Sequence, residues 1–144
     1  MTYNEFVKTP ARLRRRMLHK ADEVAMKWEI CTKSTPSLTE KVQSSPENTS
    51  ERTRISYIEA KRELYDMVAM YDKASDEVRT FLYDNLNMVD ADILEWRYVD
   101  GKTVQEIANI MGVAYQTAKN RLSSADKKAR SKFLKSVPKS TEKY

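Results

Sequence analysis

The stretch "DGKTVQEIANIMGVAYQTAKNRL", Asp100 to Leu122, decides the fold of this 144-residue chain because it contains both of its glycines. Glycine readily adopts the left-handed backbone conformation in which many helices end. We therefore expect one helix to end at Gly101 and another at Gly112. The residues between the two glycines then form a single short amphipathic helix.

A capping-box sequence opens this short helix. Thr103 to Glu106 reads TVQE, so the side chain of each end residue accepts a hydrogen bond from the backbone N–H of the other. The apolar face of the helix consists of Val104, Ile107, Ala108 and Met111. A second helix, from about Tyr115, has an apolar face of Ala118, Leu122, Ala125 and Ala129. A short helix, a tight turn and a second amphipathic helix are the pattern of a helix-turn-helix.

The outward face of the second helix is polar and cationic. It carries Gln116, Lys119, Asn120, Ser123, Lys127 and Lys128. Gln and Asn amides pair with adenine edges, and lysine pairs with guanine or phosphate. We expect this helix to enter the major groove of double-stranded DNA, supported on phosphates by Lys127, Lys128 and Arg130. The alternative is an ordinary helical hairpin whose lysines are only solvated.

The segment "ILEWRYVDGKTVQEIANIMGVAYQTAKNRLSSADKKAR" resembles the fourth region of bacterial sigma factors, which reads a promoter element. The matching features are Tyr98 before Asp100-Gly101, Glu106-Ile107-Ala108, Gly112, Thr117 to Leu122, and Ala125. The layout upstream is similar to the RinA/ArpU type of late-gene transcriptional regulator found in phages and prophages.

The resemblance implies base contacts for Tyr115, Gln116 and Asn120, and backbone contacts or helix packing for Thr117, Lys119 and Arg121. Combined with the side-chain chemistry, it gives two predicted sets. The base-reading residues are Tyr115, Gln116, Lys119 and Asn120. The phosphate-contacting residues are Thr117, Arg121, Lys127, Lys128 and Arg130. Ala114 departs from the family, which usually has a capping Ser or Thr at this position.

The N-terminal half has the spacing of a helical hairpin. One helical stripe contains Leu13, Met17, Ala21, Val24, Trp28 and Cys31, and a second contains Tyr57, Ala60 or Lys61, Leu64, Val68 and Tyr71. The intervening residues 32–54 are rich in Ser, Thr and Pro, which predicts a loop. We expect residues 1–73 to form a coiled-coil-like hairpin that associates with other copies or contacts a partner.

Residues 74–144 are predicted to form the second domain, the helix-turn-helix bundle with a basic tail. Ser75 is the expected N-cap of its first helix, and Asp90 the expected N-cap of a short helix that ends at Gly101. The fold class that follows is all-α.

Composition argues against catalysis. His19 is the only histidine and Cys31 the only cysteine, so no Ser-His-Asp or Cys-His site and no His/Cys metal cluster can form. Asp90 and Asp92 fit a helix cap better than a metal pair. We therefore expect no enzyme activity, no cofactor and no metal. One cysteine, no long apolar run and no apolar leader indicate a cytoplasmic protein without a membrane segment.

The sequence predicts a sequence-specific DNA-binding regulator of transcription, encoded by a phage or prophage. Its expected partners are double-stranded DNA, other copies of itself and RNA polymerase. One alternative is a DNA-packaging protein similar to terminase small subunits, in which the DNA-binding part usually comes first. Another is an adaptor that docks on polymerase without binding DNA.

Overall fold

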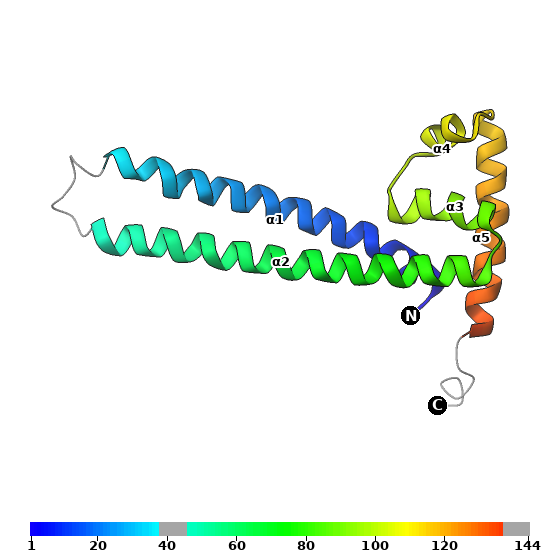
Figure 1. Ribbon diagram of the computed structural model, residues 1–144, viewed down its shortest axis with the longest axis horizontal. Coiled ribbons are helices and arrows are strands. Elements are labelled where there is room, and N and C mark those ends of the chain that lie inside the picture. The colour runs from blue at the N-terminus through cyan, green and yellow to red at the C-terminus, as the bar shows by residue number, and fades with distance from the viewer. Residues whose placement is uncertain (38–45, 137–144) are drawn as a thin grey trace. The chain divides into compact units, whose positions relative to one another are not determined.

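The computed structural model describes residues 1–37 and 46–136, and the regular structure in these ranges is helical (Figure 1). The all-α prediction is therefore confirmed. The elements are α1 (Tyr3–Ser37), α2 (Pro46–Asn85), α3 (Met88–Leu94), a π-helical turn η2 (Glu95–Val99), α4 (Val104–Met111) and α5 (Tyr115–Ser136). No helix in the described ranges has the length and apolar character to span a bilayer.

The chain forms two compact units. The hairpin unit is Leu13–Tyr71, and the C-terminal unit combines Met1–Arg12 with Asp72–Tyr144. The first twelve residues thus pack with the C-terminal unit, whereas the sequence had grouped them with the hairpin. The reason is burial, because Tyr3 and Val7 belong to the core of the C-terminal unit.

The hairpin unit pairs α1 with α2 side by side and antiparallel (Figure 1). The rings of Trp28 and Tyr57 lie 5.3 Å apart, and Lys20 Nζ lies 2.6 Å from Glu63 Oε2. Trp28 is still half exposed, because two helices alone cannot enclose a large side chain. The predicted helical hairpin is present, with a narrow seam rather than a broad core.

The predicted loop at residues 32–54 is too long. α1 continues to Ser37 and α2 begins at Pro46, while the rest of the predicted loop, residues 38–45, lies outside the described residues. Pro46 fits the first position of a helix, where its missing N–H removes no intrahelical bond. Ser and Thr cost a helix less than about 0.7 kcal/mol each, so a composition rich in them does not prevent helix formation.

Ser75 does not cap a helix, and this prediction is wrong. α2 runs without a break from Pro46 to Asn85, since no glycine or proline interrupts it near residue 75. Ser75 is 1% exposed and lies on the same helix face as the buried Val78 and Leu82. Its small side chain is accommodated against the core of the C-terminal unit. The predicted domain boundary between residues 73 and 74 therefore falls inside a continuous helix.

Three phenylalanines from distant parts of the chain meet beside the core of the C-terminal unit. Phe6 of α1, Phe81 of α2 and Phe133 of α5 have pairwise ring-centroid distances of 5.3 to 5.7 Å. Such tilted and edge-to-face pairs add stability beyond the area they bury. These ring contacts pack the start of α1 and the end of α5 against α2.

The cap of α3 is Asn87 rather than the predicted Asp90. The Asn87 side chain accepts a hydrogen bond from the Asp90 backbone N–H at 2.9 Å, and its Nδ2 donates to the Asp90 carboxylate at 3.0 Å. Asn and Asp cap helices about equally well. Starting at Asn87 places the Asp90 carboxylate in the first turn of α3, where the helix dipole favours it.

Candidate nucleic-acid interface

The capping box and both glycines adopt the predicted conformations. Glu106 N donates to Thr103 Oγ1 at 3.2 Å, and Thr103 N donates to Glu106 Oε1 at 3.0 Å. The hydrogen bond donated by Thr103 N lowers the pKa of the Glu106 carboxyl. Gly101 and Gly112 have φ of 73° and 69°, the left-handed conformation that favours glycine.

The turn between α4 and α5 is fixed by backbone hydrogen bonds. Gly112 N donates to Asn109 O at 3.3 Å, and Val113 N donates to Ala108 O at 3.1 Å. This is the pattern of a Schellman motif, which satisfies the last carbonyls of α4 and redirects the chain into α5.

The two helices pack through small side chains. Ala108 of α4 and Ala118 of α5 are fully buried, and Ile107 is 1% exposed beside them. Alanine has no side chain beyond Cβ, so two helix axes can approach closely at these positions. Ala125 and Ala129 continue the buried stripe along α5, as the sequence predicted.

The four residues predicted to read bases lie together on the exposed surface of the first two turns of α5. They are Tyr115, Gln116, Lys119 and Asn120. Gln116 Nε2 donates a hydrogen bond to Asn120 Oδ1 at 3.1 Å. The two amides are thus held side by side on one helix face. Ala114 lies just before this first turn and offers no side-chain acceptor to its N–H groups.

The residues predicted to contact phosphate fall into two groups. Thr117, Arg121 and Lys127 are exposed and form no ion pair within the described part of the chain. Lys128 and Arg130 are exposed as well, but both contact other elements of the C-terminal unit. Of the residues predicted to contact phosphate, Lys128 and Arg130 thus already have partners within the protein, whereas Arg121 and Lys127 form no ion pair within the described residues.

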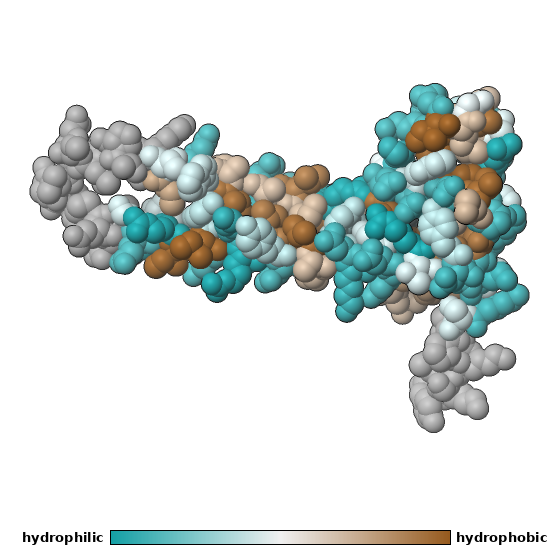
Figure 2. Space-filling view, in the orientation of Figure 1, coloured by the Kyte–Doolittle hydropathy of each residue, from teal (hydrophilic) through white to brown (hydrophobic). Residues whose placement is uncertain are grey.

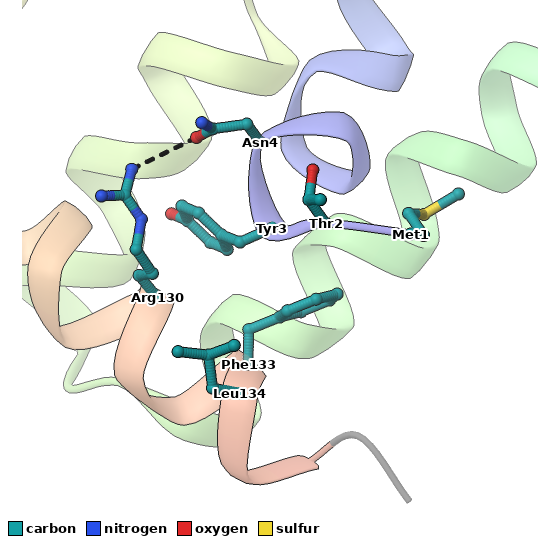
Figure 3. Close-up of a pocket in the computed structure, with 7 residues that line it drawn as sticks. All are labelled: Met1, Thr2, Tyr3, Asn4, Arg130, Phe133 and Leu134. Carbon is teal, nitrogen blue, oxygen red and sulfur yellow. Dashed lines mark hydrogen bonds between the residues drawn. The ribbon is translucent and has the colours of Figure 1, made fainter. Parts of the chain in front are cut away.

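The contacts of Lys128 and Arg130 hold α5 in place. Lys128 Nζ lies 3.1 Å from Asp90 Oδ2 on α3. Arg130 donates to Asn4 Oδ1 at 3.2 Å, and its guanidinium lies 5.6 Å from the centre of the Tyr3 ring. Figure 3 shows Arg130 of α5 beside Tyr3 and Asn4 of the N-terminal segment. A phosphate at either cation would compete with these intramolecular contacts.

Asp126 is a structural residue that sequence reasoning missed. It is the only acid in α5, and its carboxylate accepts hydrogen bonds from Tyr3 Oη at 2.7 Å and from Tyr98 Oη at 2.9 Å. Burial and these contacts raise the pKa of both tyrosines. The signal available in the sequence was position, since Leu122, Asp126 and Ala129 share the inward side of the helix at spacings of four and three.

The C-terminal part of α5 borders a mostly apolar hollow of about 340 Å³ (Figure 3). The hollow is lined by the N-terminal segment and by Arg130, Phe133 and Leu134 of α5. Among the described residues that line it, Arg130 has the one charged side chain. Within residues 1–37 and 46–136, no group of three or more His, Cys, Asp or Glu side chains is arranged to hold a metal ion. Exposed polar and cationic side chains run along the whole of α5, and the exposed amides of Gln116 and Asn120 lie in its first half.

The short α4, the left-handed turn at Gly112 and the exposed polar face of α5 define a helix-turn-helix. A protein-family model for sigma-70, region 4, matches residues 85–128. The match runs from the end of α2 to Lys128 and covers less than a third of the chain. Residues 85–128 are thus a helix-turn-helix similar to sigma-70 region 4, in agreement with the resemblance seen in the sequence. No curated protein and no solved structure matched the chain.

Proposed function

We propose that this protein is a sequence-specific DNA-binding regulator of transcription, with α5 as its recognition helix in the major groove. The observation that carries the proposal is the pair of amides on α5, Gln116 and Asn120, hydrogen-bonded to each other on an exposed face directly after the helix-turn-helix turn. Side-chain amides form bidentate hydrogen bonds with adenine, and Lys119 beside them can pair with guanine.

Phosphate contacts come from the exposed cations of α5 in this proposal. Arg121 and Lys127 are not ion-paired within the described residues, so they are available to DNA at no cost in intramolecular contacts. The first-turn N–H groups of α5 add a further phosphate site, because helix N-termini attract anions and Ala114 leaves these groups uncapped. Lys128 and Arg130 contribute only by giving up or sharing Asp90 and Asn4.

We place the protein among phage or prophage regulators of the RinA/ArpU type, acting in the cytoplasm. The support is the layout, in which a sigma-like helix-turn-helix follows a long hairpin that lies outside the family match. The hairpin is then available to other copies of the chain and to RNA polymerase, the two protein partners that we propose.

Selection of bound sequences from random duplex DNA, followed by fluorescence anisotropy, tests the proposal. On the selected site, Gln116→Ala or Asn120→Ala should cost about 1–3 kcal/mol, with a smaller loss on random DNA. The two losses should not add, because each substitution also removes the hydrogen bond between the amides.

Lys127→Ala should weaken binding to both DNAs alike and lower the salt slope by about one. Arg52→Ala, an equal loss of charge on an exposed position of the hairpin, is the matched control and should change neither quantity.

Equal losses on both DNAs from the two amide substitutions would mean that α5 holds DNA without reading it. Absence of binding to any duplex at low salt would favour the polymerase-docking adaptor. Ring-shaped oligomers would favour a DNA-packaging protein.

A further inference from the structure

The outer side of α2 in the hairpin unit carries a second helical stripe. It consists of Ile55, Ile58, Arg62, Tyr65 and Ala69, at spacings of three, four, three and four residues. This is the spacing of the a and d positions of a coiled coil, in which Ile55, Arg62 and Ala69 occupy a and the other two occupy d.

The stripe lies away from α1. Ala60, which is buried in the seam with α1, is on the opposite side of α2 from Ile58 and Tyr65 by helical periodicity. Ile55, Ile58 and Tyr65 are 50%, 48% and 60% exposed. Figure 2 shows hydrophobic residues exposed along the hairpin between hydrophilic ones. Three large apolar side chains are thus exposed on one side of α2, and an exposed apolar patch of this kind marks a binding surface.

The charged residues that flank this stripe are sorted by sign. Arg54 and Lys61 each precede an a position, whereas Glu59 and Asp66 each follow a d position. Charges at these g and e positions of coiled coils set partner choice and orientation. One flank therefore presents cations and the other presents anions.

These flanking charges differ from those between α1 and α2. Lys20 pairs there with Glu23 and Glu63 inside the hairpin. Within the described residues, Arg54, Glu59 and Asp66 form no ion pair, and Lys61 lies 5.8 Å from the ring centres of Tyr57 and Tyr65 without an acidic partner.

The flanking charges favour a second copy of the same stripe in parallel orientation. When two copies of the stripe lie parallel and in register, Arg54 of one faces Glu59 of the other, and Lys61 faces Asp66. An antiparallel pair would place cations opposite cations and acids opposite acids. Like charges at this distance oppose association.

We propose that the outer stripe of α2 binds the same stripe of a second copy of this chain, parallel and in register. The inference names the surface for the self-association proposed above and rests on that part of the proposed function. A parallel pair brings both copies of Tyr71 to the same end, so both C-terminal units continue from that end. Two-fold symmetric operators with two half-sites would suit such a dimer.

Arg62 is the one cation inside the stripe. A single polar residue at an a position lowers the stability of a coiled coil while it fixes register and oligomeric state. The long side chain can direct its charge to solvent and keep its methylene groups in the contact. The surface is thus built for a specific and modest association.

Sedimentation equilibrium of the full chain tests the surface. Ile58→Asp places two buried charges in each dimer and should raise the dissociation constant more than about a hundredfold. Arg62→Leu should lower it at least about tenfold. Met26→Asp on α1 is the matched control, since Met26 is 65% exposed but lies outside the stripe, and it should leave association unchanged.

A charge exchange tests the pairing. Arg54→Glu and Glu59→Arg should each weaken the dimer about tenfold at low salt, and the double variant should regain most of the loss. Recovery in the double variant excludes a merely structural effect of either substitution, because only a restored cross-pair can produce it.

A single-cysteine variant tests the direction. In a Cys31→Ser background, Ile55→Cys should form an intermolecular disulfide if the helices are parallel. In an antiparallel pair centred on Arg62 the two positions would lie roughly 21 Å apart and could not bond.

A wild-type chain that stays monomeric at micromolar concentrations would overturn the inference. Association unchanged by Ile58→Asp, or no disulfide at position 55 in a dimer, would do the same. A monomer that binds its selected DNA site would leave the proposed function standing and remove only this surface.

Discussion

Removing one hydroxyl should show how firmly the N-terminal segment is held in the C-terminal unit. Tyr3→Phe deletes the group that donates to Asp126 Oδ1 at 2.7 Å, while the ring keeps its contact with Phe133. Tyr3 is 4% exposed and Asp126 is partly buried, so water can replace the lost donor only in part. A hydrogen bond to a charged group contributes about 1.5–3 kcal/mol. Since Tyr98 still donates to Asp126, we expect a loss of about 2 kcal/mol.

The chain allows a specific optical assay of this loss. It contains two tryptophans, so a Trp28→Phe background leaves Trp96 of η2 as a reporter of the C-terminal unit. With a urea slope of about 1–3 kcal/mol/M, the unfolding midpoint should fall by about 1 M. Tyr115→Phe removes the same hydroxyl from an exposed residue and should change stability by less than about 0.5 kcal/mol.

A double-mutant cycle isolates the bond itself. Tyr3→Phe combined with Asp126→Asn should reveal a coupling free energy of at least about 1 kcal/mol, as expected for residues in one hydrogen-bond network. A loss for Tyr3→Phe no larger than that of the Tyr115→Phe control would refute the reasoning. The residues Met1–Arg12 would then be held in the C-terminal unit by their apolar contacts and by the contacts of Arg130, without a contribution from the Tyr3 hydroxyl.

Three further outcomes follow from local geometry. A Cβ at Gly112 would meet no atom within 4 Å, so Gly112→Ala should lower the free energy of unfolding only by the cost of left-handed φ, about 1–2 kcal/mol, and Gly112→Asn by less, both measured in urea. Ala114→Ser should raise the melting temperature, because it supplies the missing N-cap of α5, worth about 1 kcal/mol. The pKa values of Tyr3 and Tyr98 are raised above 10.0 in the folded state, so the unfolded chain releases these protons first. Stability should therefore be retained below about pH 10 and fall above it, and Tyr98→Phe should flatten that fall in urea titrations across the alkaline range.

The segment from Gly101 to Ala129 could be predicted because local rules determine it. The capping box at Thr103, the left-handed glycines and the four-three spacing of small apolar residues each act within a few residues of sequence. All of them agree on a helix-turn-helix, and agreement of independent local signals is what makes a sequence specify one structure. The exposed face of α5 then follows by exclusion, since residues outside the buried stripe must face solvent.

The sequence-based predictions failed where contacts between distant parts of the chain determine the structure. Ser75 is a good N-cap by itself, but the burial of its neighbours Val78 and Leu82 keeps α2 helical through it. The N-terminal segment has no local feature that assigns it to the C-terminal unit. Its place depends on Phe6 meeting Phe81 and Phe133, a contact between three helices that no periodicity in one helix reveals.

The cations of α5 show why a count of positive charge does not define a DNA-binding surface. Lys127, Lys128 and Arg130 looked equivalent in the sequence, and all three were predicted to contact phosphate. In the structure Lys128 bonds to Asp90 and Arg130 to Asn4, whereas Lys127 is not ion-paired within the described residues. A phosphate contact at Lys127 has no intramolecular bond to break. Lys127→Ala should therefore reduce the salt slope by about one, while Lys128→Ala should reduce it less and also lower stability, since it removes the bond between α3 and α5. Equal slope changes for the two variants, at equal stability, would show that the contact with Asp90 does not restrain Lys128.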